Sequence, residues 1–296
     1  MNYYNESKNK LIENEIYIKV KDYLKERNTL ATYYEIGKLL NEAGGKYGDN
    51  IIDTYSKKLV HEVGEKYSKR TLFRMKQLYK VFSNENVSKI WTQLSWSHIK
   101  LLFSMDVNSI NYYISIIRKQ NISVRDLETK IKNKEYERLL TETKDKLIKG
   151  ENADIKDLVP DPILIKKNSD METISEKMLH QLILENITLF MKELGNGFSY
   201  IDSEYKIKIG NNYHRIDLLF FNIKYNAYVV VELKVKEFKA EFISQVQKYM
   251  NYIDKNIKEP SNNNTIGIII CKKENKFVIE YCSDNRIIVR EYELIR

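Results

Sequence analysis

The chain has 296 residues, of which 43% are hydrophobic and 11% aromatic, and its 49 Lys and Arg against 41 Asp and Glu give a formal net charge of +8. This composition excludes an intrinsically disordered chain, and the length suits two modest domains better than one large core. No run approaches the roughly 18 to 20 apolar residues of a membrane span, and the start MNYYNESKNK lacks the apolar region of a secretion signal, so we expect a cytoplasmic protein without a membrane partner.

Cysteine, histidine and glycine patterns exclude several kinds of site. Cys271 and Cys282 are too few for a disulfide framework, and together with four scattered histidines they offer no zinc-binding spacing. The sequence also lacks the GxxxxGK[ST] loop that binds nucleotide phosphates. These absences argue against a zinc site and against nucleotide-driven chemistry.

The basic charge is concentrated in the first half of the chain. Residues 1–150 contain 28 Lys and Arg against 19 Asp and Glu, a net charge of +9, which leaves 21 against 22, or −1, for residues 151–296. Residues 51–100 alone contain 10 basic and 4 acidic residues. Such an excess is typical of a protein that binds a polyanion such as DNA, although a solvated Lys-rich surface produces the same count.

The first half is predicted to consist of helices joined by short polar loops. Apolar residues recur with helical spacing between 11 and 41, and the glycine-rich stretch 44–48 is expected to end that block. A second helix is predicted over about 50–63, and Ser68 is placed to cap a third, KRTLFRMKQLYKVF, over 69–82. Further helices are expected over 91–103, 107–120 and 124–149.

The helix over 69–82 is the best candidate for an element that contacts DNA. Arg70 and Arg74 share one face of it with Gln77, while its apolar residues lie on another face. Two short helices separated by a tight turn, the second lined with basic residues, are typical of a helix-turn-helix or winged-helix-like module. An ordinary amphipathic helix of a bundle has the same pattern, so both interpretations stand.

A change of pattern marks a second domain. The polar stretch GENADIKD and the prolines of DLVPDP predict a linker over 151–172, between a helical, basic domain at 1–150 and a further domain at 173–296. In the further domain a helix over about 173–194 is followed by strands and one more helix, which are expected over 205–209, 215–221, 227–235, 238–253 (the helix), 265–271 and 277–281. This order predicts an α/β domain with a buried central sheet.

Charged residues interrupt two of these apolar strands. Asp217 lies in RIDLLFF, and Glu232 and Lys234 lie two residues apart, on one strand face, in YVVVELKV. A buried charge is costly unless it is paired or bound to a metal ion, so three such charges need a common explanation. If NIKYNA forms a simple hairpin turn, paired residues have numbers that add up to 449, which places Asp217 directly opposite Glu232.

Two carboxylates in that position repel each other unless a cation lies between them. A hard divalent ion with oxygen ligands, Mg²⁺ or Mn²⁺, satisfies both and leaves positions for water and a phosphate oxygen. Lys234 beside them can orient the attacking water and stabilise the charge of the transition state. We therefore expect a metal-dependent phosphodiesterase with Asp217 and Glu232 as metal ligands and all three residues in catalytic roles.

These residues resemble the signature of a nuclease superfamily. Asp217 followed by Glu232-Leu233-Lys234 looks like the D…(D/E)xK motif of PD-(D/E)XK nucleases, and Gln245 with Tyr249 resembles the QxxxY motif of their RecB-like members. Longer stretches, from ELGNGFSYIDSEYKIKIG to TIGIIIC and including YYEIGKLL and LSWSHIKLL, are similar to the bacterial YhcG-like proteins. Those proteins join an N-terminal helical, winged-helix-like domain to such a nuclease domain.

The resemblance implies a restriction-endonuclease-like fold for the C-terminal domain and a Mg²⁺- or Mn²⁺-dependent DNA nuclease, active in defence against foreign DNA or in recombination and repair. It also implies that Gln245 and Tyr249 line the substrate groove. An enzyme with one site per chain that cuts a duplex often needs two copies, so a homodimer is expected. This chain departs from the family pattern in the first helix of the second domain. YhcG-like sequences carry Glu near the position of Met178–His180 in this chain, and neither Glu176 nor Glu185 lies at that position.

Two other hypotheses fit the same sequence. The three charged residues can form a buried ion-pair cluster in a catalytically inactive descendant of the fold, which would then be a nucleic-acid-binding or assembly module. The N-terminal helices can also offer aromatic residues around Trp91 and Trp96 to a protein partner, although large aromatic residues more often belong to a core. Divalent-ion binding that depends on Glu232 separates the nuclease from the scaffold.

Overall fold

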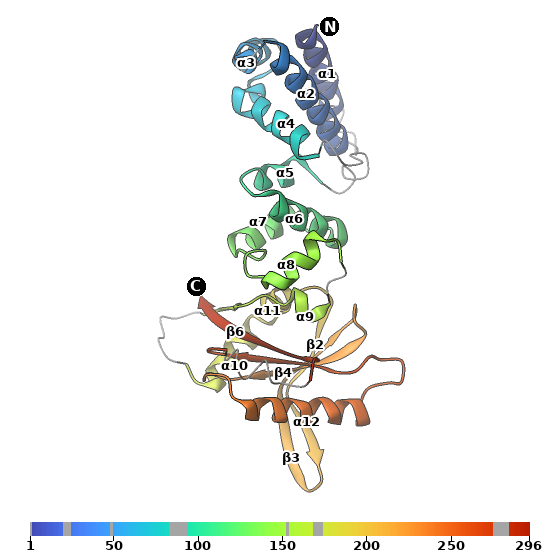
Figure 1. The fold of residues 1–296 in the computed structure, drawn as a ribbon, viewed down its shortest axis with the longest axis vertical. Coiled ribbons are helices and arrows are strands. Elements are labelled where there is room, and N and C mark those ends of the chain that lie inside the picture. The colour runs from blue at the N-terminus through green and yellow to red at the C-terminus, as the bar shows by residue number, and fades with distance from the viewer. Residues whose placement is uncertain are drawn as a thin grey trace. The chain divides into compact units, whose positions relative to one another are not determined.

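The computed structural model describes residues 2–19, 25–47, 50–82, 94–151, 154–167, 174–274 and 284–296. The chain divides into two units, residues 1–136 and residues 137–296 (Figure 1). The predicted strand over 277–281, Cys282 and Trp91 lie outside the described residues.

The first unit is built from helices. They are α1 (Tyr3–Lys19), α2 (Lys25–Tyr47), α3 (Ile51–Glu62), the 3-10 turn η1 (Glu65–Tyr67), α4 (Lys69–Phe82), α5 (Trp96–Leu102), α6 (Val107–Gln120) and α7 (Val124–Lys132). The expected helical domain is therefore confirmed, and α3, η1 and α4 form the predicted pair of short helices with a tight turn between them. The described residues of this unit contain no strand, so the wing of a winged helix is not observed among them.

Helix α2 continues through the glycine-rich stretch that was expected to end it. The helix ends only at Tyr47, and its buried Leu40 and Ala43 carry the apolar face past Gly37. Burial of this face, on both sides of Gly37, outweighs the low helix propensity of that glycine. Gly37 itself lies where α2 meets α4, because a Cβ atom at this position would be 2.0 Å from the carbonyl oxygen of Met75.

The prediction of one helix over 124–149 is wrong, because the chain turns in the middle of this segment. Helix α7 ends at Lys132, where the amides of Asn133 and Lys134 donate to the carbonyls of Thr129 and Ile131. Lys134 has a φ of 53°, in the left-handed region that does not continue a helix. The division between the two units falls two residues later.

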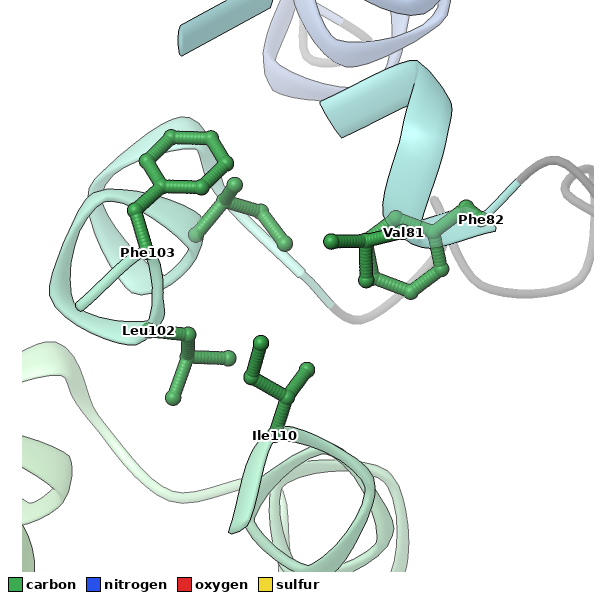
Figure 2. Close-up of a pocket in the computed structure, with 6 residues that line it drawn as sticks. Val81, Phe82, Leu102, Phe103 and Ile110 are labelled. Carbon is green, nitrogen blue, oxygen red and sulfur yellow. The ribbon is translucent and has the colours of Figure 1, made fainter. Parts of the chain in front are cut away.

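Aromatic and apolar side chains fill the interior of the first unit. Trp96 is half-buried, and its ring lies 4.8 Å from that of Tyr33 and 5.8 Å from that of Phe103, as in a core. A small pocket between α4, α5 and α6 has only apolar side chains around it (Figure 2). These are Val81, Phe82, Ile99, Leu102, Phe103 and Ile110. A pocket without a polar group offers packing space and no chemistry.

The second unit contains a six-stranded mixed sheet. Its elements are α8 (Thr141–Ile148), α9 (Ile155–Leu158), β1 (Ile163–Lys166), α10 (Glu176–Glu185), α11 (Ile187–Leu194), β2 (Phe198–Ile209), β3 (Asn212–Asn222), β4 (Ala227–Leu233), α12 (Ala240–Asn256), β5 (Ile266–Cys271) and β6 (Ile287–Ile295). The strand order is β1-β6-β5-β4-β3-β2, with antiparallel pairing of β2, β3 and β4 and parallel pairing of the rest. The predicted α/β domain is confirmed.

Helices cover both faces of this sheet (Figure 1). Val229 and Val231 of β4 belong to a core with residues of α10 and α11, whereas Val230 belongs to a second core with α12. Because both faces are buried, β4 is a continuous apolar run, and a charge in it is conspicuous. No helix in the described part of the chain is long and apolar enough to cross a membrane.

Some details of the second unit differ from the sequence expectations. The segment expected to be a linker contains α9 and β1, and β1 pairs in parallel with β6, a strand that was not predicted. The helix expected over 173–194 is divided at Asn186 into α10 and α11. Arg290 of β6 is buried and donates to the carbonyls of Val159 and Lys156, which links the sheet to the α9 region.

Replacing Gly37 by alanine is predicted to destabilise the first unit. The new methyl group would overlap a backbone carbonyl, so α2 and α4 must separate, at a cost of about 1–3 kcal/mol. Gly44→Ala is the control, because its methyl group meets only the flexible end of Lys76, at 3.3 Å, and alanine favours the helix by up to about 1 kcal/mol. Urea unfolding followed by circular dichroism measures both, and equal effects would contradict this packing.

Candidate active site

The hairpin of β3 and β4 brings the predicted acidic residues together. Its paired residues have numbers that add up to 449, as predicted from the sequence, from Asn222 opposite Ala227 to Leu218 opposite Val231. The ladder ends at Leu218 and does not include Asp217. Instead, Asp217 Oδ2 accepts a hydrogen bond of 2.8 Å from the backbone N–H of Leu233. Asp217 is thus held against the residue that follows Glu232.

Asn222 sets this register at the other end of the hairpin. Its side chain is buried, and its Oδ1 accepts from the backbone N–H groups of Lys224 (3.0 Å) and Tyr225 (3.1 Å). Asn226 completes the turn with a φ of 48°, which asparagine tolerates better than most residues. A one-residue slip would turn the charged side chains to the opposite face, so this turn positions the site.

Glu232 is the most buried acidic group of the site, with 1% of its surface exposed. Its Oε1 accepts hydrogen bonds from Lys234 Nζ at 2.7 Å and from Gln245 Nε2 at 2.6 Å. Its Oε2 is buried and has no hydrogen-bond partner among the described residues. A buried carboxylate oxygen without a partner costs about 1–3 kcal/mol or more, so it requires an explanation.

Burial dominates the electrostatics of the two carboxyl groups. Burial, with repulsion from Asp217, raises the pKa of Glu232 to about 7. Burial also raises the pKa of Asp217, against the opposing effects of the Leu233 N–H and Lys234. The pKa of Lys234 is raised even though burial alone lowers it, because its ammonium group bonds to Glu232. The lysine therefore stays charged, and one cation does not relieve both carboxylates.

These residues fit a hard divalent ion. Asp217 and Glu232 offer carboxylate oxygens, the ligands that Mg²⁺ and Mn²⁺ prefer, and an ion between them would satisfy the partnerless Oε2 of Glu232. Within the described ranges, no group of three or more His, Cys, Asp or Glu is arranged to hold a metal. Two protein ligands leave most positions to water and to a phosphate, as is usual for Mg²⁺.

Helix α12 holds Glu232 from one side. Gln245 and Tyr249 lie one turn apart, and Gln245 Nε2 donates both to Glu232 Oε1 and to the Tyr249 hydroxyl, at 3.1 Å. Tyr249 is only 3% exposed, so its side chain belongs to the core. Both residues were expected to line a substrate groove; here Gln245 contacts the carboxylate and Tyr249 contacts Gln245.

Helix α10 approaches from the other side and contains a residue that the sequence reasoning did not single out. His180 Nε2 donates to the backbone carbonyl of Asp217 at 3.1 Å. Glu176, in the first turn of α10, is near enough to contribute to the raised pKa of both Asp217 and Glu232. Glu185 instead accepts a hydrogen bond from Gln181. The only sequence signal for His180 was its place where related sequences carry glutamate.

Arg70 and Arg74, the predicted DNA contacts, belong to the first unit, whereas the residues described above belong to the second. On α4 Arg70 is exposed and Arg74 is half-buried. Gln77, which shared their face, donates its side-chain N–H to the carbonyl of Phe103 at 2.8 Å and is therefore a structural residue. The structure brings Asp217, Glu232, Lys234, Gln245 and Tyr249 together in the second unit, apart in sequence from the two arginines.

Sequence comparison assigns a family to each part of the chain. Residues 156–295 match the family described as YhcG PDDEXK nuclease domain, and residues 14–138 match the DUF1016 N-terminal domain. "Putative nuclease YhcG" of Escherichia coli (strain K12) is 24% identical over 310 residues, which cover 89% of this chain and 83% of that protein.

Solved structures match over less of the chain. A repair endonuclease from Pyrococcus abyssi is 22% identical over 42% of this chain and 50% of its own, with a TM-score of 0.31. The EndoMS-dsDNA2 complex is 18% identical over 44% of this chain and 48% of its own, with a TM-score of 0.29. This chain spans about half the length of both.

The charge state of Glu232 predicts a specific pH dependence of stability. A folded-state pKa of about 7, above the ordinary 4.5, favours folding at acidic pH, and this contribution is lost as the pH rises through about 7. Glu232→Gln removes the titration. In EDTA, the free energy of unfolding of the variant relative to the parent should therefore increase by roughly 2 kcal/mol from pH 5 to pH 8.

Denaturant unfolding at the two pH values measures this difference. Glu185→Gln, which neutralises an exposed carboxylate of α10, is the control. Its free energy of unfolding should change between the two pH values by the same amount as that of the parent. An identical pH response of Glu232→Gln and the parent would show that Glu232 titrates like a solvated glutamate.

Proposed function

Since the chain belongs to the YhcG-type PDDEXK nucleases, we propose that it hydrolyses phosphodiester bonds of DNA with the help of a divalent metal ion, Mg²⁺ or Mn²⁺. One observation carries the proposal. Glu232 is buried, and its Oε1 accepts hydrogen bonds from Lys234 and Gln245. Its Oε2 has no hydrogen-bond partner among the described residues, although Asp217 lies on the neighbouring strand. Packing alone gives no reason to bury a carboxylate in this state.

In this proposal Asp217 and Glu232 hold the ion, which when bound makes water more acidic and neutralises negative charge on phosphate. The Leu233 N–H fixes Asp217, and Gln245 fixes Glu232 through Oε1, so that Oε2 is available as a ligand. Tyr249 fixes Gln245 in turn. Gln245 and Tyr249 are therefore proposed as positioning residues.

Lys234 is the proposed catalytic cation. It directly follows β4, and its ammonium group is 2.7 Å from Glu232 with 13% of the side chain exposed. The raised pKa keeps it protonated at neutral pH. A positioned ammonium group can hold the attacking water and stabilise the negative charge that develops on the phosphate oxygens.

The alternative is a catalytically inactive module in which Lys234 and Glu232 form a structural ion pair. Such a pair satisfies one oxygen of Glu232 and leaves its Oε2 without a hydrogen-bond partner among the described residues, with the carboxylate of Asp217 nearby. The alternative therefore explains fewer of the observed contacts than a metal site does.

We further propose that residues 1–150 bind the DNA. Their net charge of +9 attracts a polyanion, and Arg70 on α4 is exposed, with Arg74 one turn further along the same face. We propose that duplex cleavage uses a homodimer, because each chain has one candidate site. Defence against foreign DNA, or recombination and repair, is the proposed role.

Mutation of the site tests catalysis directly. Asp217→Asn and Lys234→Ala should each lower the rate of cleavage in Mg²⁺ or Mn²⁺ by about 100-fold or more, because they remove an ion ligand and the catalytic cation. The substrates are linear, circular, single-stranded and branched DNA. Calorimetry should show divalent-ion binding to the parent and none to Glu232→Gln.

Glu185→Gln is the matched control, since it neutralises a carboxylate of the same unit outside the site, and it should cleave like the parent. Cleavage that survives both site substitutions would refute the proposed function. Folded variants are verified by their circular dichroism spectra.

Substitution of the basic face of α4 tests DNA binding by the first unit. Arg70→Gln with Arg74→Gln should weaken binding and reduce the slope of log affinity against log salt by up to about 1.8 for duplex DNA, because each lost phosphate contact removes about 0.9. Arg118→Gln with Arg125→Gln, two exposed arginines of α6 and α7, is the control. The hypothesis fails if the two pairs give the same slope.

A further inference from the structure

A long hairpin extends from the sheet next to the candidate active site. Strands β2 and β3 pair as far as Ile209 opposite Asn212, whereas β4 pairs with β3 only from Leu218 onward. Residues 205–216, which we name the hairpin arm, therefore leave the sheet as a two-stranded ribbon. Figure 1 shows this ribbon projecting past α12.

The inner face of the hairpin arm packs on α12. Ile207 lies opposite His214, and residues directly opposite in an antiparallel pair share a face. Ile207 belongs to the core that contains Tyr249, and the ring of His214 lies 6.2 Å from the Tyr249 ring. Tyr249 bonds to Gln245, which bonds to Glu232. The hairpin arm is thus anchored on the helix that holds the candidate metal ligand.

The outer face has a different chemistry. Lys206 lies opposite Arg215 and Lys208 lies opposite Tyr213, and all four side chains are exposed. Tyr213 is 61% exposed, with Lys206 Nζ 4.2 Å and Lys208 Nζ 5.7 Å from its ring centroid. Residues 205–216 include three Lys and Arg and no Asp or Glu.

This outer face does not stabilise the fold in an obvious way. Like charges directly opposite each other, as in Lys206 and Arg215, destabilise a strand pair, and among the described residues Glu204 offsets them through its ion pair with Arg215. Lysine on the edge strand β2 hinders aggregation, but that explains neither Arg215 nor the exposed Tyr213 on β3. A cationic strip around an exposed aromatic ring matches the chemistry of a nucleic-acid strand.

We propose that the outer face of the hairpin arm binds the phosphate backbone of the DNA substrate beside the active site. Lys206 and Lys208 contact phosphates, and Tyr213 packs against a sugar or base. This inference rests on the proposed function and adds to it a substrate-binding surface within the second unit, separate from Arg70 and Arg74.

Binding by the full chain in EDTA, where no cleavage is expected, tests the inference. Lys206→Gln with Lys208→Gln should weaken binding of fluorescently labelled DNA at least about fivefold and reduce the log-log salt slope by about 1.4 for single strands or 1.8 for duplex. The control is Lys156→Gln with Lys166→Gln, which removes equal charge from exposed lysines on α9 and on β1, the opposite sheet edge. Equal losses for the two pairs, or no loss for the first, would overturn the inference.

Lysine footprinting of the parent protein gives a second measurement that needs no variant. An amine-reactive reagent should label Lys206 and Lys208 in the free chain and label them several-fold less in the DNA complex, with Lys156 and Lys166 unchanged. Unprotected hairpin lysines would overturn the inference.

Cleavage assays distinguish this inference from the proposed function. If the parent cleaves DNA in Mg²⁺ and Asp217→Asn does not, while Lys206→Gln with Lys208→Gln binds and cleaves like the parent, the inference fails and the function stands. If the hairpin lysines are protected but the parent cleaves no DNA, the hairpin arm is supported and the function fails.

Discussion

The burial of one carboxylate beside another is the constraint on which the candidate site depends. Glu232 lies in a strand covered on both faces, so its charge cannot be relieved by bulk water, and Asp217 is held nearby through the Leu233 N–H. Lys234 and Gln245 compensate one oxygen only. The remaining imbalance raises the pKa of Glu232 and makes the site receptive to a divalent cation.

The sheet and its two helical layers keep this arrangement in place. On one side α12 supplies Gln245 and Tyr249, and on the other α10 supplies His180, which bonds to the backbone of Asp217. The contact from α12 fixes the carboxylate of Glu232 and the contact from α10 fixes the backbone of Asp217, which is the kind of support that a metal or catalytic site requires. The hairpin arm extends this support outward, because its His214 packs on Tyr249.

Local sequence identified the elements whose pattern is strong. Helix α4 begins and ends where its capping and apolar spacing predicted, and the β3–β4 register followed from the length of one turn. Elements that depend on distant partners were missed or misjudged. β1 is a four-residue strand that exists through its pairing with β6, α2 continues past Gly44 and Gly45 to Tyr47, and the helix predicted over 124–149 breaks where Lys134 takes a positive φ.

The sequence by itself determined the two-part organisation, the helical and α/β classes, and Asp217, Glu232 and Lys234 as candidate site residues, because charges in apolar strands and a two-residue period are local signals. The resemblance to nucleases added Gln245 and Tyr249. Only the tertiary structure decided what those residues do to one another. It showed that Tyr249 is buried and bonds to Gln245, that His180 reaches the Asp217 backbone, and that Glu232 has one oxygen without a partner in the described chain. The physical reason is that hydrogen-bond partners and burial depend on segments far apart in the sequence, which no local pattern specifies.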